Sequence, residues 1–222
     1  GLTGVEVAGE LIDYVEDLKA KTDIYVVEKV GRAVPFLGNE KASRLVEEYL
    51  KCRGVRFLFG KGVTEVKPDG VILEDGQFIE GDLVIWTAGV APNSLAKKLN
   101  LPKKGRGWIV VKPTIQVEGY DEVYAPGDIN CAQFNDEVAM KMAEEAMFQA
   151  KVAIVNIKRT LEGKPLIHHK IEFSTRSPKS LISLGGNQTV LVYGRKFAYR
   201  GRLPYLIKKI YVEKRYMSRF KD

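Results

Sequence analysis

Two glycines open the chain, Gly1 and Gly4, at the spacing of the second and third glycines of a G-x-G-x-x-G phosphate-binding loop. After them, apolar side chains recur at helical spacing, so we expect a helix that begins at Gly4. A β-branched run follows and ends at Glu28, which predicts a buried parallel strand. A loop, a helix and a strand in this order make half of a βαβ unit. This order constrains the fold more than any other feature of the sequence.

The same segment predicts a dinucleotide site. Glycines let the backbone approach a pyrophosphate closely, and the free amides at the start of the helix attract it. Glu28 would accept hydrogen bonds from a ribose diol and would repel a 2′-phosphate, which favours NADH over NADPH. Taken alone, the two glycines fit an ordinary helix start equally well. The strand and the carboxylate of Glu28 at its end favour the interpretation as a dinucleotide site.

The rest of the chain alternates helical and strand patterns. Before the middle of the chain we expect a helix over 39–53, a strand over 55–59, an antiparallel meander over 62–81 and a strand over 82–89. After a loop we expect strands over 108–119 and 122–128, a helix from about Asp136 to Glu162, short strands over 168–200 and a basic helix from near Pro204.

The net charge of +7 is a local property of the C-terminus. Between Gly194 and Asp222 there are ten Lys or Arg and two acidic residues, whereas the preceding residues carry 25 basic and 26 acidic side chains. Because the body is close to neutral, we expect no nucleic-acid partner. Binding to DNA that depends on salt and on this tail would favour that alternative.

The two cysteines, Cys52 and Cys131, have no neighbouring cluster of ligands, which argues against a zinc site or a disulfide scaffold. We therefore expect no metal and a reducing, cytoplasmic location. No apolar run is long enough to cross a bilayer.

Four stretches carry a family resemblance: GLTGVEVAGEL, VVEKVGRAVP, IWTAGVAPN and VYAPGDIN. They follow one another in the order seen in flavoproteins with two dinucleotide-binding domains. Among these, the chain resembles most the type II NADH dehydrogenases, in which FAD passes electrons from NADH to a membrane quinone. In that family another glycine and a whole FAD-binding half precede the residue that matches Gly1. The resemblance therefore implies a truncated chain that is inactive by itself.

With the resemblance, we predict an α/β protein in three segments. Residues 1–95 would form a Rossmann-like NADH-binding domain without its first strand. Residues 96–162 would be the returning part of an FAD-binding domain, and 163–222 a C-terminal domain of antiparallel strands and a basic amphipathic helix.

The resemblance also implies the cofactor-binding residues of both domains. Gly1, Thr3, Gly4 and Glu28 would bind NADH, Gly127 and Asp128 would bind the ribityl chain of FAD, and the small residues Ala88 and Gly89 would let the backbone face the cofactors. A turn aspartate that caps the next segment is the alternative for Asp128.

Two carboxylates are candidate catalytic groups. The resemblance places Glu6 near the nicotinamide and the flavin, where it would orient the ring or relay a proton; the alternative is a solvated residue in the first turn of a helix. Glu144 stands where the family has a glutamine beside the quinone, as a proton donor or as a salt-bridged helix residue.

Other functions stay open at this point. A sulfide:quinone oxidoreductase would use redox cysteines, and Cys131 follows the APGD motif closely. We interpret Cys131 as a small buried residue and Cys52 as part of the core. A non-catalytic nucleotide-binding or membrane-docking module is the remaining alternative.

The C-terminal segment has its basic residues largely on one part of its surface and an apolar row on another, made of Leu203, Leu206, Ile207, Ile210 and Tyr211. Such a helix can lie in a membrane interface near anionic headgroups, or it can pack on the protein with a solvated basic face. Because a membrane quinone has to be reached, we expect the docked form, peripheral on the inner face of the cell membrane. The sequence leaves open whether the protein forms a homodimer.

Overall fold

The computed structural model contains the whole chain, and the structure describes residues 1–215. Two compact units are present. The first unit joins Gly1–Ala88 to the segment that starts at Lys179, and the second unit is Gly89–Pro178. These boundaries differ from the predicted segments because the last strands pack on the first helices. The assignment of segments 1–95, 96–162 and 163–222 to an NADH-binding, an FAD-binding and a C-terminal domain stays a prediction.

Helix α1 (Leu2–Asp17) begins at Leu2, with Gly1 as its N-cap, and not at Gly4 as predicted. The helix starts earlier because Gly1 takes the flanking position and its carbonyl accepts the first backbone hydrogen bond, from Val5. One face of the helix is buried, since its apolar positions recur every three or four residues. The buried residues are Val5, Ala8, Gly9 and Ile12.

Strands β1 (Tyr25–Glu28) and β2 (Arg56–Phe59) form a parallel pair. Helix α2 (Glu40–Cys52) connects them after a short 3-10 helix, η1 (Pro35–Leu37). The side chain of Asn39 caps α2 by accepting a hydrogen bond from a backbone N–H of the first turn. A parallel pair joined by a helix is the predicted βαβ arrangement, and it confirms the Rossmann-like prediction for this segment.

The predicted meander is also present. Strand β4 (Gly70–Leu73) pairs antiparallel with β3 (Val63–Lys67) on one side and with β5 (Phe78–Glu80) on the other. The turns fall where predicted, at Pro68-Asp69 and at Asp75-Gly76. Gly76 has a φ of 82°, which glycine adopts without steric cost.

The strand predicted over 82–89 is wrong. In the described structure this segment forms no strand and has no paired neighbour, and Leu83 is 71% and Trp86 62% exposed. An apolar run becomes a strand only where another strand accepts its backbone hydrogen bonds. Strand β1 pairs with β2 alone among the described residues, so nothing is present to complete the ladder beside 82–89.

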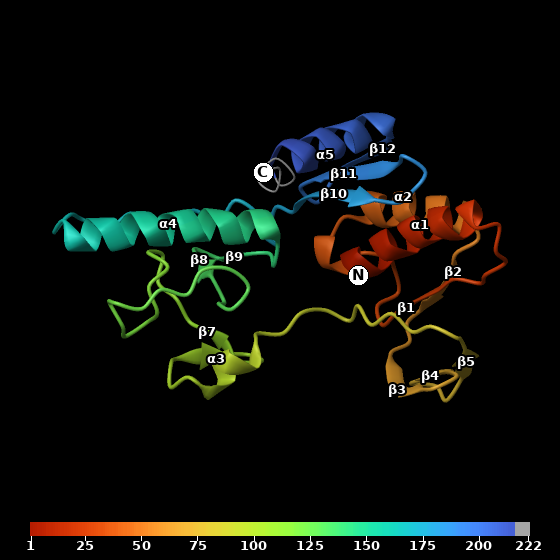
Figure 1. Cartoon of the computed structure of the whole chain (residues 1–222), viewed down its shortest axis with the longest axis horizontal. Helices are drawn as coiled ribbons and strands as arrows, with labels where there is room; N and C mark the ends of the chain where they lie inside the picture. The colour runs from red at the N-terminus through yellow and green to blue at the C-terminus, as the bar shows by residue number, and fades with distance from the viewer. Residues whose placement is uncertain (216–222) are drawn as a thin grey trace. The chain divides into compact units, whose positions relative to one another are not determined.

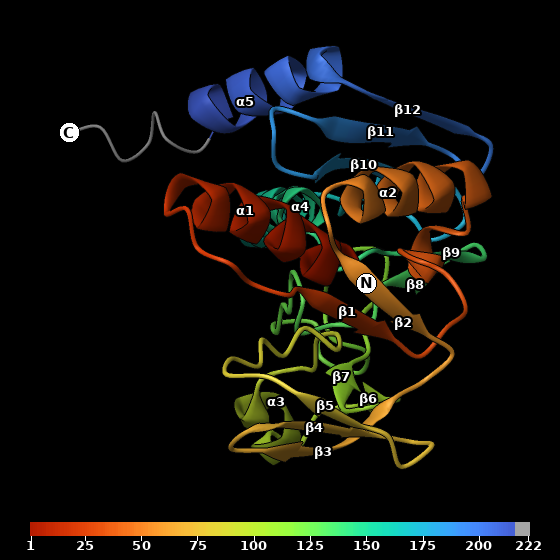
Figure 2. The ribbon, with the colours of Figure 1, turned by 90° about the vertical axis from the view of Figure 1, so that its right-hand side faces the viewer.

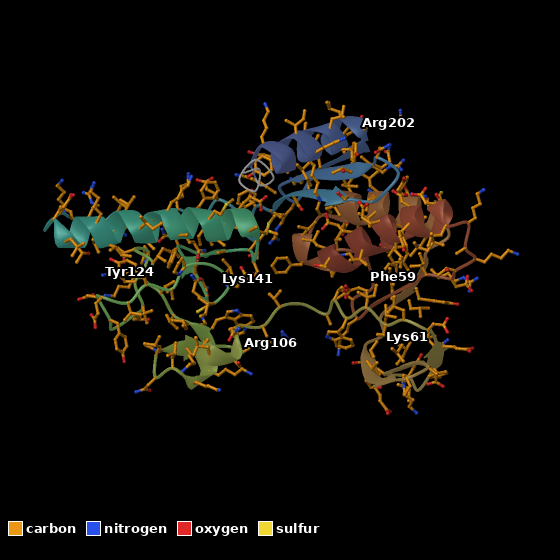
Figure 3. The ribbon with its side chains drawn as sticks, in the orientation of Figure 1. Phe59, Lys61, Arg106, Tyr124, Lys141 and Arg202 are labelled. Atoms are coloured by element: carbon orange, nitrogen blue, oxygen red, sulfur yellow. The ribbon has the colours of Figure 1, made fainter. Side chains whose placement is uncertain are left out.

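A second sheet completes the first unit. Strands β10 (Lys179–Ser183), β11 (Thr189–Tyr193) and β12 (Phe197–Gly201) form an antiparallel meander, and helix α5 (Arg202–Arg215) follows directly. The predicted strands therefore start at Lys179 and not at 168. Arg202 is the first residue of α5 (Figure 3).

The elements of the first unit form layers (Figure 2). The parallel pair β1 and β2 lies under α1 and α2, these helices pack on the sheet β10–β12, and α5 covers the other side of that sheet. Val190, Val192 and Ala198 face the helices and are fully buried, because alternate residues of a strand point to the same face. The sheet of the last strands thus gives α1 and α2 their second buried face.

The second unit contains several short elements and one long helix, α4, which spans Ala143–Leu161 (Figure 1). Its elements before the long helix are α3 (Ser94–Lys98), β6 (Lys103–Lys104), β7 (Trp108–Ile109), β8 (Gln133–Phe134) and β9 (Glu137–Val138). The strands predicted over 108–119 and 122–128 are reduced to β7 and isolated bridges. The core residues are Ala96, Ile109, Val111, Val117, Ala125, Ala132 and Ala139.

Helix α4 (Ala143–Leu161) starts later than the predicted Asp136. Asn135 and Asp136 have φ values of 48° and 63° and form the turn between β8 and β9. A right-handed helix cannot pass through two left-handed residues, so the hairpin delays its start.

Gly9 allows the backbone of α1 to contact the last sheet of the first unit directly. A Cβ atom at Gly9 would lie 2.3 Å from the carbonyl carbon of Leu184, in the turn between β10 and β11. Gly185, in the same turn, is equally close to the backbone of Gly9. The side chain of Asp13 then accepts a hydrogen bond from the N–H of Gly186 at 2.7 Å and pairs with Arg53 at 2.6 Å. The first helix and the last sheet are therefore joined through backbone contact.

We expect Gly9→Ala to lower the free energy of unfolding by about 1–3 kcal/mol, because the backbone of Leu184 has to move. The higher helix propensity of alanine, about 1 kcal/mol, offsets only part of that loss. Urea unfolding followed by circular dichroism measures the change. Gly81→Ala is the control, since no atom lies within 4 Å of the added methyl group. Equal stability of the two variants would contradict the packing argument.

Candidate functional site

The start of α1 is open to an anion. No side chain caps the helix, and its first turn holds no acidic residue. The first amides of a helix have no partner inside it, and they lie at the positive end of its dipole. A Cβ at Gly1 would meet no atom within 4 Å, and Thr3 is exposed. These residues fit the diphosphate of a dinucleotide.

Gly4 is held close to the segment after the meander. A Cβ at Gly4 would lie 2.9 Å from the hydroxyl oxygen of Thr87, in the TAG motif. The structure thus brings the glycine loop and this motif together, although they are far apart in the sequence. Ala88 and Gly89, which follow Thr87, are exposed, and Gly89 has a φ of 93°. They fall at the boundary of the two units, and their contact with cofactors stays a prediction.

Glu28 lies beside Gly1, as a nucleotide-binding carboxylate should. One carboxylate oxygen is 2.8 Å from the amino nitrogen of Gly1, and the other accepts a hydrogen bond from the N–H of Val30 at 3.1 Å. Burial disfavours the ionised form of Glu28, but hydrogen bonds from the terminal amino group of Gly1 and from the N–H of Val30 outweigh that effect, so the pKa of Glu28 in this 222-residue chain is lowered. The carboxylate is therefore ionised near neutral pH.

Glu6 is partly buried and is held by two partners. Its Oε1 atom accepts hydrogen bonds from the N–H of Ser183 at 3.0 Å and from the ammonium group of Lys208 at 2.6 Å. Ser183 ends β10 and Lys208 lies on α5, so both partners come from the last part of the chain. The sequence pattern did not indicate either of them. The proximity of Glu6 to a nicotinamide stays a prediction.

In the second unit, Gly127 and Asp128 belong to a surface turn. Gly127 has a φ of 85°, and a Cβ there would lie 3.3 Å from the Cβ of Ala146 on α4. Asp128 is exposed, so its carboxylate can accept hydrogen bonds from the hydroxyl groups of a ligand. The turn fits the approach of a sugar-like chain, as predicted for FAD.

Lys141 is a partly buried cation near this turn, and sequence reasoning missed it. It lies in the segment that leads into α4 (Figure 3), and its ammonium group donates a hydrogen bond to the carbonyl oxygen of Asn130. The ammonium group also lies 5.8 Å from the centre of the Trp108 ring. Burial lowers the pKa of Lys141, and the charge of Asp128 partly opposes that shift.

The candidate quinone residue Glu144 is half-buried in the first turn of α4. Within residues 1–215 it makes no ion pair, so the structure does not support the salt-bridged alternative. Its neighbour Glu145 is the deeply buried carboxylate, at 1% exposed. Burial raises the pKa of Glu145, but hydrogen bonds from His169, Phe173 and Gln149 outweigh it and the net shift is downward. Helical spacing alone did not distinguish these two residues.

The cysteines do not form a redox pair. Cys52 is exposed on α2, so its predicted place in the core is wrong; it lies in the last turn, on the side away from the buried Val46 and Leu50. Cys131 is partly buried, and burial raises the pKa of its thiol above the ordinary value, which disfavours the reactive thiolate. The two residues belong to different units. The part of the chain that the structure describes also shows no group of three or more potential metal ligands.

Comparisons with known proteins agree with this geometry. Over the full length of the chain, it is 29% identical to the type II NADH:quinone oxidoreductase of Haemophilus influenzae and spans 50% of that protein. It is 30% identical over 95% of its length to the enzyme of the same name from Staphylococcus saprophyticus, of which it covers 54%. The chain therefore spans about half the length of the curated relatives it matches.

Among solved structures, the sulfide:quinone oxidoreductase of Aquifex aeolicus superposes with a TM-score of 0.72 over 94% of this chain and 53% of its own, at 12% identity. That likeness shows the fold. Residues 1–154 match the family described as pyridine nucleotide-disulphide oxidoreductase. The chain belongs to the pyridine nucleotide-disulphide oxidoreductase family.

Proposed function

We propose that this chain provides the NADH-binding part and a segment of the flavin-binding part of an FAD-dependent NADH dehydrogenase that reduces a quinone. The observation that carries the proposal is the uncapped start of α1 with the carboxylate of Glu28 beside Gly1. The relatives named type II NADH:quinone oxidoreductase support NADH as the donor and a quinone as the acceptor.

In this proposal, NADH and FAD supply the redox chemistry, and the protein binds and orients them. The free amides of α1 hold the diphosphate of NADH, and Glu28 accepts hydrogen bonds from its adenosine ribose. Asp128 accepts hydrogen bonds from the ribityl hydroxyls of FAD, and Gly127 allows that chain to come close to the backbone.

Glu6 would fix the nicotinamide end of the site. Its position is determined by the N–H of Ser183 and by Lys208, so the carboxylate cannot rotate freely. A carboxylate in a fixed position is suited to orienting a ring or accepting a proton. For the acceptor, Glu144 would lie beside the quinone, with its half-buried carboxyl group as a proton donor.

Helix α5 would bring the protein to the membrane. Leu203, Leu206, Ile207 and Ile210 are 46–63% exposed and recur at helical spacing, and Arg202, Lys209 and Lys214 are exposed around them. An exposed apolar row flanked by cations suits the interface of an anionic bilayer. Within residues 1–215, no helix is both long and apolar enough to cross a membrane. Arg219 and Lys221 of the basic tail lie outside the described residues.

We expect Glu28→Gln to weaken NADH binding about tenfold, because charge-assisted hydrogen bonds to the ribose are lost. Binding of NADPH should improve, since the negative charge that repels its 2′-phosphate is removed. Isothermal titration calorimetry with both nucleotides measures the ratio. Glu65→Gln is the control, because Glu65 is exposed on the meander. An unchanged NADH to NADPH ratio in Glu28→Gln would refute this role.

The activity itself is tested by stopped-flow absorbance with the flavin-loaded protein that contains this chain. NADH should bleach the flavin, and a quinone should restore its absorbance. Glu6→Gln keeps an acceptor for the N–H of Ser183 but removes the charge, so we expect flavin reduction to slow tenfold or more. The control Glu10→Gln changes an exposed residue of the same helix. Absence of flavin reduction in the wild type contradicts the proposed function, and equal rates in the two variants contradict the role of Glu6.

We expect the single variants Leu206→Asp and Ile210→Asp each to have a partition coefficient onto vesicles with anionic lipid that is more than tenfold lower. Each variant removes an apolar side chain whose burial contributes about 1.5–3 kcal/mol. Co-sedimentation measures the bound fraction. Leu161→Asp is the matched control, since Leu161 is an exposed apolar residue at the end of α4, at 85%. If all three variants bind vesicles like the wild type, α5 is not the docking element.

A further inference from the structure

A chain of buried polar groups runs through the second unit and ends at the Gly127 turn. Its centre is Glu145, in the first turn of α4 and 1% exposed. An ionised carboxylate at this depth is stable only when its oxygens accept several hydrogen bonds. The start of the helix also favours a negative charge through its dipole.

On one side, Glu145 fixes the segment that follows α4. Its Oε1 atom is 2.6 Å from Nε2 of His169, whose side chain is also buried. Its Oε2 atom accepts hydrogen bonds from the N–H groups of Glu172 and Phe173, at 3.2 Å and 3.1 Å. These bonds use both oxygens and hold the carboxylate in one orientation.

On the other side, Glu145 determines how Gln149 is oriented. Gln149 is 2% exposed, and its amide nitrogen donates to Oε1 of Glu145 at 3.2 Å. Because an ionised carboxylate can only accept, the amide group of Gln149 has to turn its NH₂ toward Glu145. Its carbonyl oxygen then points the other way.

That carbonyl oxygen accepts hydrogen bonds from the candidate flavin-binding turn, which contains Gly127 and Asp128. Gln149 Oε1 accepts hydrogen bonds from the N–H of Gly127 at 2.8 Å and from the side-chain amide of Asn130 at 2.7 Å. Asn130 is fully buried and donates in addition to the carbonyl of Ala125. Both ends of the turn that contains Asp128 are thus tied to one side-chain oxygen.

We propose that Gln149 is a positioning residue for the Gly127–Asp128 turn, that Glu145 sets its orientation, and that this arrangement increases the affinity of the turn for the ribityl chain of FAD. This inference rests on the proposed function, since it takes FAD as the ligand of the turn. Neither residue touches the cofactor in this scheme. Gly127 has a left-handed φ of 85°, and the bond from its N–H holds it in that conformation.

The first test measures the turn without any cofactor. Amide hydrogen exchange in the 222-residue chain, read by NMR, gives protection factors for Gly127 and for Val117, whose N–H is bonded to Val123 in the core. In Gln149→Leu, which has no acceptor, we expect the protection of Gly127 to fall about tenfold relative to that of Val117. A constant ratio of the two protection factors overturns the inference.

Gln149→Glu tests the role of Glu145. The new side chain keeps an acceptor for Gly127 but places a second carboxylate against Glu145, and two adjacent carboxylates do not both ionise readily. His169, which is bonded to Glu145, and Lys141 are the other titratable groups to consider beside this pair. We expect the Gly127 to Val117 ratio to be low at pH 8. It should recover at pH 5.5, where the introduced carboxyl group is protonated and again donates to Glu145. A ratio in this variant that does not change with pH contradicts the role of Glu145.

Asn156→Asp is the matched control. Asn156 lies on the same helix and is fully buried, and its side chain bonds to backbone groups of Thr114 and Ile167. This variant should lower the protection of Gly127 and Val117 together. A selective loss at Gly127 in Asn156→Asp would show that the turn loosens without any change at Gln149, and it would overturn the inference.

The second test measures the consequence for the ligand. Fluorescence titration of FAD into the apo form of the protein that contains this chain should give a Kd about tenfold higher for Gln149→Leu than for the wild type or Asn156→Asp. An unchanged Kd with a loosened turn overturns this inference and leaves the proposed function intact. If the wild type binds no FAD, the proposed function fails together with the ligand assigned to the turn.

Discussion

Helix α1 lies against the turn between β10 and β11 so closely that no side chain fits between them at Gly9, where a Cβ would be 2.3 Å from Leu184. This backbone contact fixes the helix from one side, and β1 supports it from the other. Its open N-terminus, the position of Glu6 and the distance to Glu28 all follow from where this helix lies. The last strands of the chain therefore help to position the residues of its first turn.

A glycine that allows close backbone packing is present at both proposed ligand sites. Gly4 gives Thr87 room beside the start of α1, and Gly127 lets its turn pass within 3.3 Å of Ala146. In both places a missing side chain brings backbone groups to the surface where a cofactor would lie. Charged side chains complete each region: Glu28 at the first, and Asp128 with the partly buried Lys141 at the second.

The elements that could be predicted are those whose cause is local. The helices α1 and α2, the strands β1 and β2 and the meander follow from periodicity and turn residues within a few positions. The segment 82–89 could not be predicted, because an apolar run needs a partner strand that the pattern does not specify. The start of α4 depended on the left-handed turn at Asn135 and Asp136, which helical periodicity does not reveal. In the site, motif residues were identifiable, whereas Lys208 beside Glu6 and Gln149 beside Gly127 come from distant parts of the sequence.

The first unit is assembled from both ends of the chain, and the second unit is one continuous stretch between them. During synthesis on the ribosome, residues 89–178 emerge complete before the strands that cover α1 and α2 have been made. The apolar faces of these two helices, including Val5, Ile12 and Val46, stay uncovered until the sheet β10–β12 has been made. Such an order leaves the apolar faces of α1 and α2 open to chaperones until β10, β11 and β12 have been made.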